Sequence, residues 1–160
     1  MKKVNDVRHG RHCVFQLHAH LVFVTKYRYG VFTQAILEDL REIFTRVCQD
    51  FEAELVECDG EDDYVHLLVL YPPKVALSSL VNSLKGVSSR LIRKKSYPSI
   101  QKKLWGGSLW SPSSFAGSCA GAPISILLIK SFIYKQILLH IFIRRGHLKT
   151  WQIIYKRQDQ

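Results

Sequence analysis

One short hydrophobic run limits how this chain can fold more than any other stretch does. Residues 64–70 are rich in Val and Leu, follow an Asp-Gly turn signal at Gly60 and stop at Pro72, so they predict a β-strand. Side chains two residues apart on a strand share a face, so Tyr64 and His66 point the same way. An imidazole in such a run is either a buried, hydrogen-bonded histidine or a metal ligand. For a lone histidine, the buried side chain is the favoured interpretation.

The rest of the chain supplies partners for this strand. Apolar and β-branched residues predict further strands over residues 13–25, 52–58 and 108–119. The last contains Pro112, which places it at a sheet edge. Apolar residues recurring at spacings of three and four predict helices over residues 32–51, with Thr33 as the N-cap, and 75–95.

The order strand, helix, strand, strand, helix, strand is the ferredoxin-like βαββαβ arrangement. The sequence therefore predicts an α+β fold with an antiparallel sheet, both helices on one face and the opposite face open. Residues 1–12 are polar and basic and are predicted to form a loose arm.

Charge is the most informative part of the composition. The chain has 23 Lys and Arg against 13 Asp and Glu, a net charge of +10. Up to residue 63 there are 8 basic and 12 acidic residues, and from residue 64 onward there are 15 basic and 1 acidic. A merely soluble basic surface normally interleaves acids, so this excess favours a nucleic-acid partner over a simple solvated face.

Length and cysteine usage set further bounds. A chain of 160 residues can bury a core of its own, and no apolar leader follows Met1. Four scattered cysteines with no C-x-x-C pair disfavour a zinc site or a disulfide framework and suit a reducing cytoplasm. Residues 124–143 are apolar, but Lys130 and Lys135 disfavour a membrane span and favour a packed or dimer-forming helix. We therefore divide the chain into a core, residues 1–123, and a C-terminal helical tail, residues 124–160.

Two further histidines lie on the strand predicted for residues 13–25. His18 and His20 share one face of it, and in the ferredoxin-like order this strand neighbours the strand of His66. Either histidine is thus a candidate extra ligand beside His66. The alternative is that both are ordinary strand histidines, because a spacing of two is weak support for a metal site.

The run GEDDYVHLLVLYPPKVALSSLVNSLKGVSSRLIRKK, residues 60–95, resembles the core of the small single-tyrosine HUH transposases that move bacterial insertion sequences. The resemblance covers about residues 7–127. It implies a ferredoxin-like fold, a homodimer, and single-stranded or hairpin DNA at insertion-sequence ends as substrate. It also implies Mg²⁺ or Mn²⁺, strand cleavage and rejoining through a 5′-phosphotyrosine, and action in the bacterial cytoplasm at the nucleoid.

The resemblance assigns roles to individual positions. The family carries His-hydrophobic-His where this chain has Tyr64-Val65-His66, so His66 matches the second metal-binding histidine and Tyr64 replaces the first. A phenol is a poorer ligand than imidazole for such an ion. Lys130 stands in the column of the nucleophilic tyrosine, and Tyr134, one helical turn later, is the nearest candidate. We therefore predict an impaired copy, whose tail is hypothesised to be a frame-shifted end.

Basic residues near the predicted strand and helix ends are the expected phosphate ligands: Lys26, Arg28, Lys85, Arg90, Arg93 and Lys94. Four aromatic residues are candidate stacking surfaces for unpaired bases: Tyr27, Tyr29, Trp105 and Trp110. Core packing is the competing role for both tryptophans. The competing function is a non-catalytic module for single-stranded DNA or RNA, because an antiparallel sheet with aromatic and basic side chains also suits RNA recognition.

Overall fold

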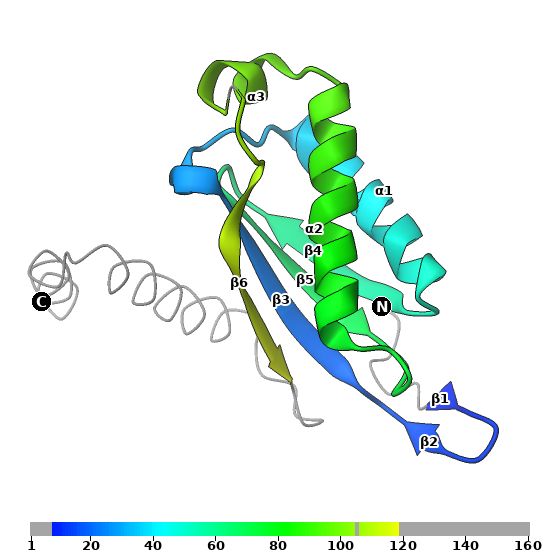
Figure 1. The fold of residues 1–160 in the computed structure, drawn as a ribbon. Coiled ribbons are helices and arrows are strands. Elements are labelled where there is room, and N and C mark those ends of the chain that lie inside the picture. The colour runs from blue at the N-terminus through cyan, green and yellow to red at the C-terminus, as the bar shows by residue number, and fades with distance from the viewer. Residues whose placement is uncertain (1–7, 105, 119–160) are drawn as a thin grey trace, which may run out of the picture. The chain divides into compact units, whose positions relative to one another are not determined.

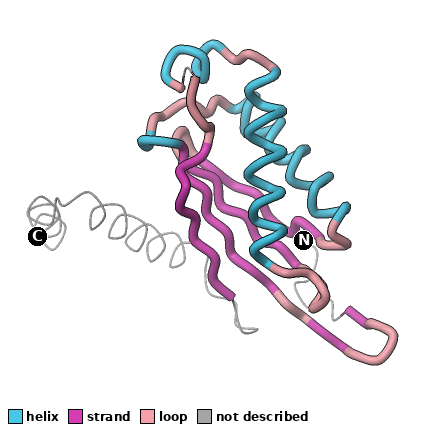
Figure 2. The backbone as a smooth tube through the Cα atoms, viewed as in Figure 1, coloured by secondary structure: helices cyan, strands magenta, loops and turns pink. Residues whose placement is uncertain are grey.

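The structure, a computed structural model, describes residues 8–104 and 106–118 (Figure 1). Its main sheet is antiparallel, with strand order β4-β5-β3-β6. These strands span Glu54–Gly60, Tyr64–Leu70, His18–Thr25 and Trp110–Ser118, in that order across the sheet. Helices α1 (Gln34–Asp50) and α2 (Leu77–Lys94) lie together on one face (Figure 2). The predicted α+β, ferredoxin-like architecture is confirmed.

Several element boundaries differ from the prediction. The strand expected over residues 13–25 is divided: β2 (Val14–Phe15) forms a short hairpin with β1 (Arg8–His9), and β3 begins only at His18. The prediction of a loose arm over residues 1–12 is therefore wrong at residues 8–9, where backbone pairing orders the chain. The short helix α3 (Pro98–Lys103) was not predicted. Pro98 begins it, since a proline at the first helical position loses no hydrogen bond there.

The turn between β4 and β5 also lies later than predicted. Asp59 pairs with His66 and Gly60 with Val65, so the strand continues past residue 58 and the chain reverses at residues 61–63. The Asp59 carboxylate accepts a hydrogen bond from the Gly60 amide at 2.9 Å. This short contact is the turn chemistry that the sequence indicated, but it occurs within the strand.

The core lies between the sheet and the two helices. Leu21, Phe23, Val65 and Leu67 point toward the helices, and each is 0% exposed. Trp110 at the start of β6 packs edge-on against Phe23, with ring centroids 5.7 Å apart. Its indole N–H donates to the Ser88 hydroxyl on α2 at 2.9 Å. Trp110 is thus a core residue, one of the two roles weighed for it.

The opposite face of the sheet is not open as predicted. Val22, Val24, Leu68 and Leu70 alternate with the core residues of β3 and β5 and point away from the helices. All four are nevertheless buried, with at most 8% of their surface exposed. His66 belongs to this second buried face.

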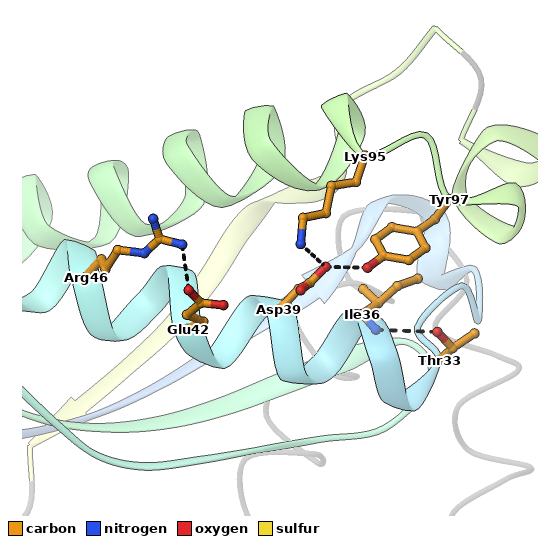
Figure 3. Close-up of polar contacts among 7 residues, drawn as sticks. All are labelled: Thr33, Ile36, Asp39, Glu42, Arg46, Lys95 and Tyr97. Atoms are coloured by element: carbon orange, nitrogen blue, oxygen red, sulfur yellow. Dashed lines mark hydrogen bonds and ion pairs between the residues drawn. The ribbon is translucent and has the colours of Figure 1, made fainter.

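Figure 3 shows how α1 is fixed to the segment that follows α2. The Thr33 hydroxyl caps α1 by accepting from the Ile36 amide. The Asp39 carboxylate accepts from the Tyr97 hydroxyl and lies 2.7 Å from Lys95 Nζ. One acidic side chain therefore joins α1 to the end of α2 and the start of α3.

All described residues belong to the first of two units into which the chain divides, residues 1–120. The helix predicted over residues 124–143 lies outside the described residues. Within residues 8–104 and 106–118, no helix has the length and apolar character needed to cross a membrane.

Candidate metal and nucleic-acid site

Two histidines meet on the buried face of the sheet that points away from the helices. His20 on β3 pairs with Leu68, and His66 on β5 pairs with Val22, so the two imidazoles are diagonal neighbours. His20 Nδ1 and His66 Nε2 are 2.9 Å apart, and the rings stack at 5.1 Å between centroids. The sequence predicted that His18 or His20 could lie near His66, and the strand register brings His20 into contact with it. This contact does not distinguish an extra metal ligand from an ordinary buried strand histidine.

The environment of the pair is largely apolar. His20 is 7% exposed and His66 is 3% exposed. Burial lowers the pKa of His20 from its usual value, and the nearby His18 lowers it further. One facing nitrogen must donate and the other accept, so the hydrogen bond requires that one, and only one, of the two facing nitrogens carries a proton.

Strand β6 contributes a glycine and an aromatic ring beside the histidine pair. Gly117 on β6 lies opposite His20 and has no side chain. The Phe115 ring occupies that space, since a Cβ at Gly117 would lie 2.9 Å from Phe115 Cε1. Phe115 is paired with Val22, so an aromatic ring borders the histidine pair on the β6 side.

The spacing of the two histidine nitrogens can be compared with that of two ligands on one metal ion. Two nitrogens bound at right angles, each about 2.1 Å from one octahedral ion, are about 3.0 Å apart. The observed separation of 2.9 Å is close to that spacing. Imidazole nitrogens suit Zn²⁺, Ni²⁺ or Cu²⁺ better than Mg²⁺, which prefers oxygen ligands.

The other expected ligand, Tyr64, lies on the same strand face as His66 and pairs with Val24. Asp59 lies opposite His66 on β4. Within the described part of the chain, however, no group of three or more His, Cys, Asp and Glu side chains is placed to hold a metal ion. The described donors therefore fit Mg²⁺ poorly and do not complete a site.

Charge is divided between two regions of the domain. The segment 52–63, which contains β4 and the turn after it, carries only acidic charge: Glu52, Glu54, Glu57, Asp59, Glu61, Asp62 and Asp63. The C-terminal half of α2 and helix α3 carry only basic charge: Lys85, Arg90, Arg93, Lys94, Lys102 and Lys103. The basic region is the part of the described structure that suits a polyanion.

The predicted phosphate ligands fall into two groups. Arg90, Arg93 and Lys94 are exposed on α2. Arg28 instead forms an ion pair with Asp63 at 2.6 Å. Lys85 donates to the carbonyl oxygens of Ser111 and Pro112 on β6, and burial lowers its pKa.

Lys26 lies at the first position of the short helix η1 (Lys26–Arg28), with its ammonium 5.2 Å from the centroid of the Tyr27 ring. Tyr134, the predicted nucleophile, and Lys130 lie outside the described residues, as does Trp105. The sequence named His18 and His20 together as candidates beside His66, without distinguishing between them; His20 is the one that hydrogen-bonds to His66.

Comparisons with known proteins agree with this architecture. The family model described as "Transposase IS200 like" matches residues 13–136. The chain is 35% identical over 108 residues to the ISDra2 transposase TnpA of Deinococcus radiodurans, which covers 68% of this chain and 76% of that protein. It is 28% identical over 89 residues to the transposase for insertion sequence element IS200 of Salmonella typhimurium, covering 56% of this chain and 59% of that one.

Two solved structures extend the comparison. A transposase-like protein from Deinococcus radiodurans matches with a TM-score of 0.67 and 31% identity, covering 81% of this chain and 97% of that chain. A REP-associated tyrosine transposase bound to a REP hairpin matches with a TM-score of 0.47 and 14% identity, covering 89% and 76%. Because the family model spans most of the chain and the first Deinococcus radiodurans relative is matched over 76% of its length, this chain belongs to the family of IS200-like transposases.

Proposed function

We propose that the chain binds single-stranded or hairpin DNA at the ends of an insertion sequence and cleaves and rejoins it with reduced activity. Family membership supports the reaction class, and the basic surface of α2 and α3 supports the polyanionic substrate. In this proposal the protein acts as a homodimer in the bacterial cytoplasm, on DNA of the nucleoid.

The proposed reaction is a transesterification at phosphorus. The Tyr134 hydroxyl loses its proton and attacks the scissile phosphate, forming a bond between the tyrosine oxygen and phosphorus. The bond from phosphorus to the 3′ oxygen breaks, and that oxygen leaves as a hydroxyl after gaining a proton. The 5′ phosphate stays on the tyrosine until a 3′ hydroxyl reverses the step. A divalent ion, when bound, would offset negative charge that develops on the phosphate oxygens.

The residues at the expected ligand positions support the proposal that this copy has reduced activity. His66 occupies the ligand position expected from the family resemblance, but its described partner is the His20 nitrogen 2.9 Å away. Tyr64 provides a phenol where the family resemblance implies a second imidazole. A divalent ion, if bound, would be held by His66, with His20 and Tyr64 as further candidate ligands, and its affinity would be lower than with a complete set of ligands.

Covalent-adduct formation on a hairpin oligonucleotide tests the reaction. The protein is incubated with labelled DNA and Mg²⁺, Mn²⁺, Ni²⁺ or Zn²⁺, and the adduct is measured on a denaturing gel. We expect little adduct from the native chain, more from Tyr64→His, and none from Tyr134→Phe in the Tyr64→His background. An adduct from the native chain as abundant as that from Tyr64→His would refute impairment. Adduct that persists in Tyr134→Phe would assign the nucleophile elsewhere.

A second candidate function is a binding module without catalysis. The observation in its favour is that the described residues contribute no complete ligand group for an ion. Gel shifts with hairpin DNA and single-stranded RNA at matched salt distinguish the substrates. Tight hairpin binding without adduct in any variant favours the module, whereas a preference for RNA contradicts the transposition proposal. Sedimentation of the free protein tests the proposed homodimer.

A further inference from the structure

The loop after β3 exposes two aromatic rings side by side. Tyr27 is 56% exposed and Tyr29 is 44% exposed. Their ring centroids are 5.7 Å apart, with the planes tilted by 56°. Among residues 8–104 and 106–118, they are the aromatic members of a small group of exposed large apolar side chains, whose other members are Val14 and Leu17. Tyrosines are commonly placed where a ring meets a ligand and solvent together.

The backbone that holds these rings is strained. Tyr27 has φ of 60° and Arg28 has φ of 57°, in the left-handed region that bulky side chains rarely adopt. The surrounding fold fixes the loop at several points. Arg28 pairs with Asp63 at 2.6 Å, and the Thr25 hydroxyl donates to the Tyr29 carbonyl at 2.8 Å. Strained backbone that the surrounding structure enforces is concentrated at functional sites. The strain at Tyr27 and Arg28 therefore favours a ligand-binding role for this loop.

Two lysines border the loop that carries the rings. Lys26 lies 5.2 Å from the Tyr27 ring centroid, and Lys103 on α3 donates to the Gly30 carbonyl at 2.9 Å. The Asp62 carboxylate also lies next to Gly30, and Asp63 pairs with Arg28, so acidic side chains border the same loop. Lys26 is the cation placed against the Tyr27 ring itself, so a phosphate next to a base stacked on that ring would contact Lys26.

We propose that Tyr27 and Tyr29 form a stacking platform for an unpaired base in the single strand that flanks a DNA hairpin. Stacking on an exposed ring tolerates any base, because every base offers a π-face, while Lys26 and Lys103 attract the adjoining phosphates. The inference rests on the proposed DNA-binding function and adds to it a site and the chemical class of its ligand.

The test uses two hairpin oligonucleotides, one blunt and one with a single-stranded extension carrying 2-aminopurine. Binding to the full chain is followed by anisotropy, and stacking by quenching of 2-aminopurine emission. Tyr27→Gly is the main variant, because glycine accepts φ of 60° without strain and the loss of the ring is then separated from misfolding. Tyr27→Phe keeps the ring, and Tyr29→Ala removes the second one.

Alanine substitution at stacking residues typically weakens binding by about 5- to 150-fold per base. We expect Tyr27→Gly to weaken binding of the extended hairpin at least fivefold and to abolish the quenching. Tyr27→Phe should stay within twofold of the native chain. Binding of the blunt hairpin should not change, and an abasic extension should remove the difference between the native chain and Tyr27→Gly.

Three outcomes would overturn the platform. If Tyr27→Gly and Tyr29→Ala bind the extended hairpin as the native chain does, the rings do not stack on the DNA and the proposed function survives. If their loss weakens the blunt and extended hairpins equally, the rings act on the duplex or on the fold instead. Failure of the native chain to bind either DNA would refute the proposed function, and the platform with it.

Discussion

Ser88→Ala should destabilise the domain far more than the loss of one oxygen atom suggests. Ser88 is 0% exposed, and its hydroxyl accepts from Trp110 Nε1 at 2.9 Å while donating to the Leu84 carbonyl at 2.6 Å. Alanine would leave the buried indole N–H without its acceptor, which costs about 1–3 kcal/mol. Alanine's better helix propensity returns up to about 0.5 kcal/mol. We expect a net loss of about 1.5 kcal/mol in the free energy of unfolding, or about 3–6 °C in melting temperature.

The assay is urea unfolding followed by circular dichroism, combined with a double-mutant cycle. Trp110→Phe removes the donor, so Ser88→Ala in that background should cost less, and the coupling should be about 1 kcal/mol or more. The matched control is Ser78→Ala, at an exposed position of the same helix, where we expect no destabilisation. A Ser88→Ala stability within about 0.5 kcal/mol of the Ser78→Ala stability, or zero coupling to Trp110, would refute the reasoning.

Two further perturbations depend on protonation. Hydrogen bonds from Lys95 and then Tyr97 lower the pKa of Asp39 below its usual 3.8, so the folded state binds fewer protons than the unfolded chain. The stabilisation is therefore present above about pH 4 and is lost as pH falls through the lowered pKa. Asp39→Asn should lower the free energy of unfolding by about 1 kcal/mol at pH 7 and by little at pH 2.5, as measured by urea unfolding. An equal decrease at both pH values would contradict this. The pKa of His20 is lowered by burial, so with chelator present stability should fall as pH drops below 6.5, by at most about 1.4 kcal/mol per pH unit. His20→Gln should flatten that slope in thermal melts at pH 7.5 and 5.5, whereas His12→Gln, at an exposed position, should not.

The order of the main elements could be predicted from the sequence because each element has its own period and boundary. Thr33 caps α1 as expected, and the two-residue period of a strand correctly placed Tyr64 and His66 on one face. The prediction failed where pairing rather than composition decides. Asp59 and Gly60 are turn residues by type, but their pairing with His66 and Val65 extends β4 through them.

The histidine pair shows the same limit within the candidate site. Sequence alone placed His20 and His66 on neighbouring strands, which left the contact open. A register shifted by one residue would put the two imidazoles on opposite faces. The observed register, with His20 opposite Leu68 and Val22 opposite His66, is set by packing of the whole sheet. The burial of the sheet face that points away from the helices could not be predicted from the sequence either. Alternation predicts which side chains share a face, but not what covers that face.

The separation of charge also has a consequence for how quickly the protein finds DNA. With acids alone over residues 52–63 and bases alone on α3 and the second half of α2, the domain has a permanent electric dipole moment. Near a nucleic acid this dipole exerts a torque, so the molecule rotates to present its positive end before contact. The association rate constant should therefore decrease steeply as added salt shortens the Debye length, even if the dissociation rate constant changes little.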